Sequence, residues 1–346
     1  MARQILTTAL PENTKVLVTG ASGLLGSHIA EQWQLAGSAV RVILRSQRPQ
    51  TFLESLGVEF VYGDLTDPVA CQKACQGVDF VCHAAAKVGD WGRWDDFQHD
   101  TIEATRQIAE AAKSAGVKRF VQISSTSAYG HPDDSHAPIR EDYALGQNIW
   151  RNDPYTLAKV QCERHLWSLA AAGLRLTVLR PSWLYGPRDR ITLARIIGKL
   201  KSGTFRLIGP GDNRISAVDA SEVARATLLA CMQPVAEGQA YNFTDLGEIT
   251  QAEYFGIMAR AIGMEPVTRT VNYRLAYAAS VGMEAWGRLV HPHRPPLLTR
   301  YSTWLMGRRL WYDNTKIRES LGWRPLVDYQ TSLKRAVDWF LAENKG

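Results

Sequence analysis

The chain of 346 residues lacks several features that would settle a protein's class at once. Its five cysteines form no CxxC pair, so we expect reduced thiols, with neither a disulfide framework nor a metal site. Despite a net charge of +6, there is no long run of lysine and arginine and no nucleic-acid-binding motif. We therefore expect no nucleic-acid partner, and the basic excess suits an anionic substrate or surface.

Long apolar runs are also missing. A membrane-spanning helix needs about 20 apolar residues, and no stretch of the chain reaches that length. The first residues lack the apolar core of a signal peptide, so we expect a cytoplasmic protein. The nearest approach to a span is 273–290, which Arg274, Glu284 and Arg288 interrupt. We expect this stretch to pack as an ordinary core helix, with a peripheral membrane contact as the alternative.

Short β-rich runs alternate with helical patterns over the first 180 residues. Strands are predicted at 15–19, 39–44, 58–62, 78–82, 119–123 and 175–179. Helices are predicted at 27–36, 69–76, 97–115 and 155–172. This alternation predicts an α/β fold with a Rossmann-type, doubly wound parallel sheet and helices on both faces.

The remainder of the chain is less regular. A helix at 193–201, a strand followed by a helix at 217–230 and a strand at 239–243 are predicted, then helices and loops. We expect a dinucleotide-binding domain made of residues 1–181 and 215–246. A smaller, discontinuous C-terminal substrate lobe is expected from residues 182–214 and 247–346.

A glycine-rich turn follows the first predicted strand. Its spacing is GxxGxxG; the first glycine permits a tight turn and the later ones admit a pyrophosphate and close helix packing. The N-terminus of the next helix offers N–H donors and a positive dipole end to phosphates. The predicted cofactor contacts here are Gly20, Ser22, Gly23, Leu24, Leu25 and Gly26.

The end of the second strand predicts which dinucleotide binds. An acidic residue there would hold the ribose 2′-hydroxyl of NAD, but this strand ends at Leu44 and Arg45 follows. A guanidinium suits a 2′-phosphate. We therefore expect NADP(H) rather than NAD(H), the alternative being that Arg45 is a solvated surface residue.

Further cofactor contacts are expected after the third and fourth strands. Asp64 and Leu65 are placed to meet the adenine. The small residues Ala84, Ala85 and Ala86, followed by Lys87, let the backbone approach the cofactor, although close packing alone would also explain them. These expected contacts are Asp64, Leu65, Ala84, Ala85, Ala86 and Lys87.

A proton-transfer pair is predicted on the helix at 155–172. Tyr155 and Lys159 share one helix face, and a nearby ammonium lowers the pKa of a phenol toward the working pH. Lys159 would also hold the ribose hydroxyls of the cofactor. The hydroxyl cluster after the fifth strand would hydrogen-bond the substrate oxygen through Ser125, with Ser124 and Thr126 as alternatives.

These motifs resemble those of the extended short-chain dehydrogenase/reductases. The resemblance rests on Thr19-Gly-Ala-Ser-Gly-Leu-Leu-Gly26, Gly63-Asp-Leu-Thr-Asp67, Ser124-Ser-Thr-Ser-Ala-Tyr-Gly130, Tyr155-Thr-Leu-Ala-Lys159, Leu179-Arg-Pro-Ser182 and Leu321-Gly-Trp-Arg-Pro325. Within that superfamily the chain looks like the 3β-hydroxysteroid dehydrogenase branch, which includes bacterial 2-alkyl-3-oxoalkanoate reductases of long-chain olefin synthesis. Ala84-Ala-Ala-Lys-Val-Gly-Asp-Trp-Gly92 and Pro296-Leu-Leu-Thr-Arg…Leu310-Trp-Tyr-Asp313 favour those reductases.

The resemblance implies roles for particular residues. It implies that Ser125, Tyr155 and Lys159 are catalytic and that Pro181 and Ser182 lie near the nicotinamide. The family usually has an asparagine after the fourth strand, in a phrase like VNVxGT, where we expect Asp100 in this chain. The resemblance also implies a homodimer through helices near 100–115 and 155–171.

The surroundings of this site leave the substrate open. Four aromatic residues at the expected ligand side favour a hydrophobic ketone or secondary alcohol, such as a 3-oxoacyl, 2-alkyl-3-oxoalkanoate or sterol-like molecule; a core between the lobes is the alternative. They are Trp91, Trp94, Trp183 and Tyr185. Arg188, Arg190 and Arg214 would instead suit a nucleotide sugar, which keeps an epimerase or dehydratase open. A non-catalytic NADP-binding protein is the third reading.

Overall fold

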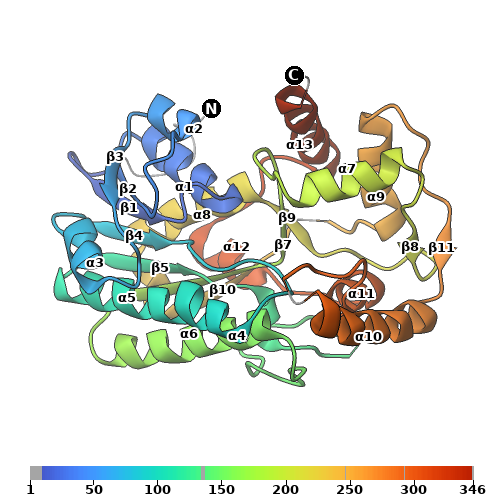
Figure 1. Cartoon of the computed structure of the whole chain (residues 1–346). Coiled ribbons are helices and arrows are strands. Elements are labelled where there is room, and N and C mark those ends of the chain that lie inside the picture. The colour runs from blue at the N-terminus through green and yellow to red at the C-terminus, as the bar shows by residue number, and fades with distance from the viewer. Residues whose placement is uncertain (1–9, 134–136, 246, 292, 345–346) are drawn as a thin grey trace.

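The computed structural model describes residues 10–133, 137–245, 247–291 and 293–344. Its main element is a seven-stranded parallel sheet of order β10-β6-β5-β4-β1-β2-β3 (Figure 1). The strands are β1 Lys15–Thr19, β2 Ala39–Leu44, β3 Glu59–Tyr62, β4 Phe80–His83, β5 Arg119–Ile123, β6 Leu176–Pro181 and β10 Gln239–Phe243. The strand order reverses direction beside β1, so the expected doubly wound α/β fold is confirmed.

Helices cover both faces of this sheet (Figure 1). Alternate residues of β1 point to opposite sides: Val16 and Val18 join one apolar cluster, and Leu17 joins the other. The first cluster lies under α1 (Leu24–Leu35) and α8 (Ala220–Met232). The second lies under α3 (Pro68–Cys75), α5 (Ala104–Ser114) and α6 (Pro154–Ala171). Burial on both faces explains why the strands are almost continuously apolar.

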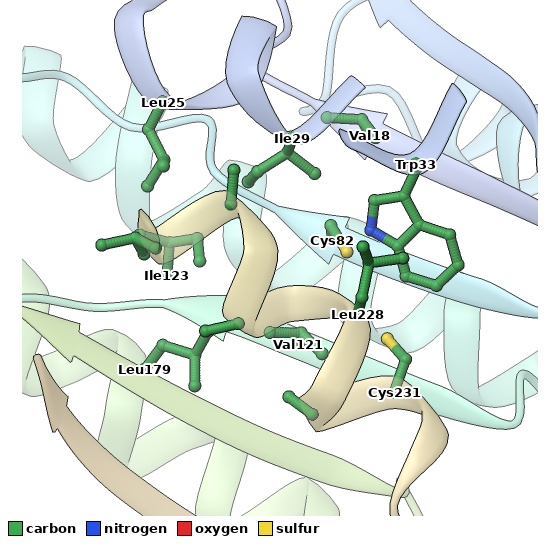
Figure 2. Close-up of a cluster of buried hydrophobic side chains, with 14 of the residues drawn as sticks. Val18, Leu25, Ile29, Trp33, Cys82, Val121, Ile123, Leu179, Leu228 and Cys231 are labelled. Carbon is green, nitrogen blue, oxygen red and sulfur yellow. The ribbon is translucent and has the colours of Figure 1, made fainter. Parts of the chain in front are cut away.

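The first cluster ties α1 to α8. Figure 2 shows side chains of both helices meeting above strands β1, β4, β5 and β6. Trp33 of α1 is fully buried there, and its indole N–H donates to Thr227 Oγ of α8 at 3.0 Å. This packing fixes the direction of α1, and therefore the place of the glycine turn at its start.

One predicted helix differs from the structure. The sequence predicts a single helix over 97–115, but the chain forms α4 (Trp94–Phe97), a π-helical segment η2 (Gln98–Glu103) and then α5. The wider π turn rotates the residues of η2 relative to a regular α-helix. The rotation decides which of these side chains faces the site.

The later half of the chain adds smaller elements beside the sheet (Figure 1). Its strands are β7 Trp183–Tyr185, β8 Leu207–Ile208, β9 Ala217–Asp219 and β11 Thr270–Val271, paired as β7-β9 and β8-β11. Its helices are α7 Thr192–Lys201, α9 Gln251–Ala261, α10 Tyr273–Val290, α11 Arg300–Gly307, α12 Thr315–Leu321 and α13 Tyr329–Glu343. The short elements α2 Thr51–Ser55, η3 Thr126–Tyr129 and η4 Pro234–Ala236 complete the chain.

The C-terminal segment reaches back to the sheet. Ile317 and Leu321 of α12, with Trp323, are buried in the same cluster as α1 and α8. Helix α13 instead packs on α7 and α9. The division into a dinucleotide domain and a discontinuous substrate lobe stays a prediction, with α12 packed on the first of them.

Helix α10 corrects another expectation. The predicted helix at 273–290 is present, but its buried residues are Ala276, Ser280, Glu284 and Gly287. Its large apolar side chains point outward, so the expectation of an ordinary core helix was wrong. Within the described ranges, no helix is long and apolar enough to cross a membrane.

Candidate active site

The glycine turn between β1 and α1 leaves no room for side chains. Gly20 has φ of +68°, and a Cβ there would lie 2.7 Å from the Ala85 nitrogen. A Cβ at Gly26 would lie 2.1 Å from the Gly20 oxygen. The turn therefore packs directly against the start of α1 and the residues after β4, as the sequence predicts.

This turn has the features that a pyrophosphate requires. Gly23 caps α1 without a side-chain hydrogen bond, and no acidic residue lies in the first turn of the helix. Ser22 and Gly23 are exposed. The backbone N–H groups at the start of α1 are thus open to an anion, and the helix dipole favours one.

The buried His83 of β4 links β1 to α5 beside this turn. His83 Nδ1 lies 2.7 Å from Thr19 Oγ on β1, and its Nε2 lies 3.0 Å from Thr105 Oγ on α5. Burial and the charge of Lys159 lower the pKa of His83 to about 3, so the ring is neutral. Ala85 N–H also donates to Thr19 Oγ at 3.2 Å, which joins the predicted alanine segment to β1.

Arg45 and Asp64 lie at the ends of β2 and β3, where the adenosine half of a dinucleotide is expected. The Arg45 guanidinium is 65% exposed and lies 3.0 Å from Asp100. Asp64 accepts hydrogen bonds from the Thr66 N–H and hydroxyl. Burial opposes ionisation of Asp64, but the Thr66 hydrogen bonds and the charge of Arg45 outweigh it and lower its pKa.

Asp100 lies beside Arg45, close to the end of β2. It points to the surface, where it pairs with Arg45 and His99. Thr101 is the buried residue of this turn, and its hydroxyl accepts a hydrogen bond from the Lys87 N–H at 2.9 Å. Thr101, one residue later, is therefore the side chain of this phrase that contacts the segment after β4.

The structure distinguishes the three hydroxyls after β5. Ser124 is buried and donates to Glu163, and Thr126 is buried as well. Ser125 alone of the three is partly exposed, and its Oγ accepts from the Ser127 N–H at 3.1 Å. This hydrogen bond leaves the Ser125 proton to donate to a ligand.

The proton-transfer pair lies on the first turns of α6. Asp153 caps the helix by accepting from the Thr156 N–H, and Pro154 begins it. Lys159 is buried, and its Nζ donates to the Ile123 carbonyl at 3.1 Å. This nitrogen lies 5.8 Å from the centre of the Tyr155 ring. The spacing that predicts one shared face is therefore present in three dimensions.

An aromatic cluster beside Tyr155 was missed from the sequence. The rings of Tyr155 and Tyr301 are 6.4 Å apart, and Trp150 stacks on His131 at 3.6 Å. Trp304 meets the His131 ring edge to face at 5.0 Å. These residues come from three segments far apart in the chain. The rise in aromatic content between 273 and 311 was the sequence signal for Tyr301 and Trp304.

The predicted substrate aromatics have separate positions. Trp91 is buried beneath Gly287 of α10. Trp183 packs on Tyr254, with ring centres 5.4 Å apart. Tyr185 is buried and donates to Asp245, so it belongs to the apolar cluster around α7, α9 and α13 and not to a substrate surface.

Two of the three arginines that suggested a nucleotide sugar are engaged elsewhere, whereas Arg190 is 70% exposed and lies 3.9 Å from Glu343. Arg188 pairs with Glu31 of α1 at 2.7 Å and lies over the ring of Phe52. Arg214 pairs with Glu248 at 2.9 Å. Neither guanidinium is brought to the hydroxyls of Ser125 and Tyr155 by these contacts.

The residues fit a nicotinamide dinucleotide. Besides the glycine turn, Ser182 follows β6 and is buried, and its hydroxyl has no hydrogen-bond partner among the residues that the structure describes. Bound cofactor would supply or accept a hydride at a carbonyl carbon. The chain itself places Tyr155, Lys159 and Ser125 as the residues predicted to act at the substrate oxygen.

Residues 16–243 match the model of the NAD dependent epimerase/dehydratase family, which is more than half of the chain. The chain belongs to the NAD dependent epimerase/dehydratase family. The expected membership of the extended short-chain dehydrogenase/reductases is confirmed, and the family description names NAD as its cofactor.

Similar proteins narrow the enzyme class. The 2-alkyl-3-oxoalkanoate reductase of Shewanella oneidensis is 28% identical over 327 residues, covering 92% of this chain and 84% of the relative. A protein of the same name from Stenotrophomonas maltophilia is 28% identical over 332 residues, covering 93% and 98%. These names agree with the expected NAD(P)-dependent dehydrogenase or reductase acting on CH–OH.

A solved structure supports the fold. The UDP-glucuronic acid 4-epimerase of Bacillus cereus in complex with NAD has a TM-score of 0.74 and 22% identity. The match covers 96% of this chain and all of that one (100%). At this identity the likeness shows the fold alone, so the choice between an epimerase and a reductase depends on the site.

Proposed function

We propose that the chain is an NADP(H)-dependent oxidoreductase that interconverts a ketone and a secondary alcohol on a hydrophobic substrate. A 3-oxoacyl or 2-alkyl-3-oxoalkanoate chain, or a sterol-like ring system, has the required chemistry. Tyr155 acts as general acid and base, Ser125 binds the substrate oxygen, and Lys159 holds the ribose hydroxyls of the cofactor. Gly20, Gly26 and Ser182 belong to the cofactor site.

The observation that carries this proposal is the environment of Tyr155. Its phenol shares a helix face with a buried lysine on one side and lies against Tyr301 on the other. Trp150, Trp304 and Tyr301 form an aromatic cluster, with Arg300 lying 5.5 Å from the centre of the Trp150 ring. Trp150 and Tyr301 are half-buried, and an apolar substrate would cover their aromatic surface without leaving a polar group unpartnered.

The cofactor preference rests on Arg45. Its guanidinium is exposed and stands after β2, where a 2′-phosphate would replace Asp100 as its partner. Asp100 partly neutralises this arginine, so the preference depends on the competition between the carboxylate and the phosphate.

The epimerase reading remains the second candidate because of the family. Against it, the contacts of Arg188 and Arg214 leave both guanidinium groups paired with acidic side chains. A UDP-sugar needs cationic partners for its diphosphate. A non-catalytic NADP-binding role is not favoured, because Tyr155 and Lys159 are both present and adjacent.

A reduced-nicotinamide absorbance assay separates these candidates. Purified protein would be given NADPH with a panel of 2-alkyl-3-oxoalkanoates and 3-ketosteroids, and separately with UDP-sugars. We expect absorbance at the reduced-nicotinamide band to fall only with the apolar ketones. Interconversion of a UDP-sugar without net consumption of cofactor would refute the proposal and support the epimerase.

We also propose a homodimer through α5 and α6. The outward row of α6 carries Leu157, Gln161, Arg164 and Ser168, a mixed surface that suits a four-helix contact. Light scattering after size exclusion should give twice the chain mass of 38.6 kDa. A monomer at micromolar concentration would contradict it.

A further inference from the structure

Helix α10 presents its apolar face to the outside. Leu275, Trp286 and Leu289 are 69%, 66% and 83% exposed. They stand at positions i, i+11 and i+14, so they lie on one side of the helix. Ala278, Ala279 and Gly282 fill the same side between them. The helix lies along the edge of the molecule (Figure 1).

The opposite face of α10 is small and polar. Ala276, Ser280, Glu284 and Gly287 are buried, again at helical spacing. Glu284 accepts from the backbone and the guanidinium of Arg300 at 2.7 Å. The usual arrangement of an amphipathic helix on a protein core is thus reversed, and Leu297, in the segment that follows α10, is also 68% exposed.

The charges around this face have one sign. Glu284 is the one acidic residue of the sequence between 271 and 300, and it is buried and paired. Arg274 at the start of the helix and Arg294 after its end are exposed, with His291 and His293 beside the second. The apolar stripe is therefore flanked at both ends by cationic side chains, which is the pattern of an interfacial helix.

We propose that this face of α10, from Leu275 to Leu289 with Leu297, docks on an anionic lipid bilayer. The apolar side chains enter the boundary between headgroups and acyl chains, Trp286 sits at the interface, and the arginines meet the lipid phosphates. A second copy of the chain fits less well. A two-fold contact between these faces would place like charges together with no acidic partner.

The docking surface lies one layer from the candidate active site. Tyr277 of α10 contacts Trp150, and α11 behind it carries Tyr301, the neighbour of Tyr155. Arg288 of α10 lies over the Trp91 ring at 4.6 Å. One consequence rests on the proposed apolar substrate: docking would place the side of the protein from which that substrate enters against the membrane. Docking itself does not depend on the substrate.

Vesicle flotation tests the proposal. The full chain would be mixed with vesicles of phosphatidylcholine alone, and of phosphatidylcholine with about a third phosphatidylglycerol, and floated on a density gradient. We expect flotation with the anionic vesicles, reduced by added salt. The Leu275→Glu/Trp286→Glu/Leu289→Glu variant should lower the partition coefficient at least about tenfold.

Two control variants test whether membrane binding is specific to this face of α10 and to its flanking arginines. Val69→Glu/Leu326→Glu alters apolar residues that are equally exposed, at 69% and 65%, but far from α10 in the sequence, and should float like the wild type. Arg274→Gln/Arg294→Gln should lose the preference for anionic vesicles. Circular dichroism would confirm that each variant is folded.

Three outcomes would overturn docking. The wild type fails to float with anionic vesicles, or the triple variant floats equally well. In the third outcome, the wild type is a dimer, the triple variant is a monomer, and neither binds vesicles. That result would assign the face to a second copy of the chain. None of these readouts requires turnover, so each is independent of the proposed reaction.

Discussion

Among single residues, Arg45 is the one that we propose selects the cofactor. It is exposed and its charge is shared with Asp100, 3.0 Å away. Arg45→Ala should weaken NADPH binding about tenfold to a hundredfold while NADH binding changes little, because only NADPH has the 2′-phosphate. Fluorescence titration with both cofactors measures this difference.

Asp100 provides the complementary prediction. Asp100→Asn removes the carboxylate that competes for Arg45 and should tighten NADPH binding about twofold to fivefold. Arg93→Ala, at an exposed arginine paired with Asp95, is the matched control and should change neither cofactor. Equal loss of NADH and NADPH binding in Arg45→Ala would mean that this side chain does not recognise the phosphate.

Single residues also show which features of the site could not be predicted from the sequence. The roles predicted for Tyr155 and Lys159 need one shared helix face, and four-residue spacing on a regular helix ensures that. The contacts of Asp100 could not be predicted, because it lies in the π-helical segment η2 and composition gives no sign of such a turn. His131, Trp150 and Tyr301 come together only through tertiary packing, which no local pattern records.

At the scale of elements, two glycines give opposite predictions: Gly26, just after the β1–α1 turn, and Gly198 in α7. Gly26→Ala should abolish dinucleotide binding and lower the melting temperature, because its Cβ would lie 2.1 Å from the Gly20 oxygen. Gly198→Ala, in α7 with nothing within 4 Å of the added carbon, should raise stability by about 0.5–1 kcal/mol. Thermal melting with and without NADPH compares them. A Gly26→Ala protein that binds NADPH normally would contradict the packing described here.

The elements themselves were largely predictable. Buried parallel strands are uniformly apolar, so β1, β2, β5 and β10 were placed with their observed bounds. Helix α10 was found but given the wrong inner face. Periodicity shows that two faces differ, and the assumption that the apolar one is buried fails here.

For the whole molecule, Asp245 links the sheet to the second lobe. It follows β10 and accepts from the Tyr185 hydroxyl at 2.7 Å, and Tyr185 also hydrogen-bonds Ser332 of α13 at 2.6 Å. Burial, followed by the nearby charges of Asp219 and Glu222, raises the pKa of Asp245 to about 8 although the Tyr185 hydrogen bond opposes this. The folded protein therefore keeps this proton at neutral pH.

This raised pKa predicts how stability depends on pH. The unfolded chain releases the Asp245 proton near pH 3.9 and the folded chain near pH 8, so the stability that this group contributes falls as pH rises between them. Asparagine cannot ionise. The stability of Asp245→Asn relative to wild type should rise by about 1.4 kcal/mol per pH unit between about pH 5 and 7. Urea unfolding at several pH values tests this, and a pH-independent difference would show that Asp245 is ionised in the fold.

The proposed reaction depends on Tyr155 being the residue that moves the proton. The measurement is the turnover rate of Tyr155→Phe with NADPH and the ketone that the wild type reduces fastest, alongside Tyr143→Phe at a more exposed tyrosine. We predict that Tyr155→Phe loses about 10²–10⁴-fold in turnover while its NADPH affinity and the Tyr143→Phe rate stay near wild type. Turnover of Tyr155→Phe at the wild-type rate would contradict the account.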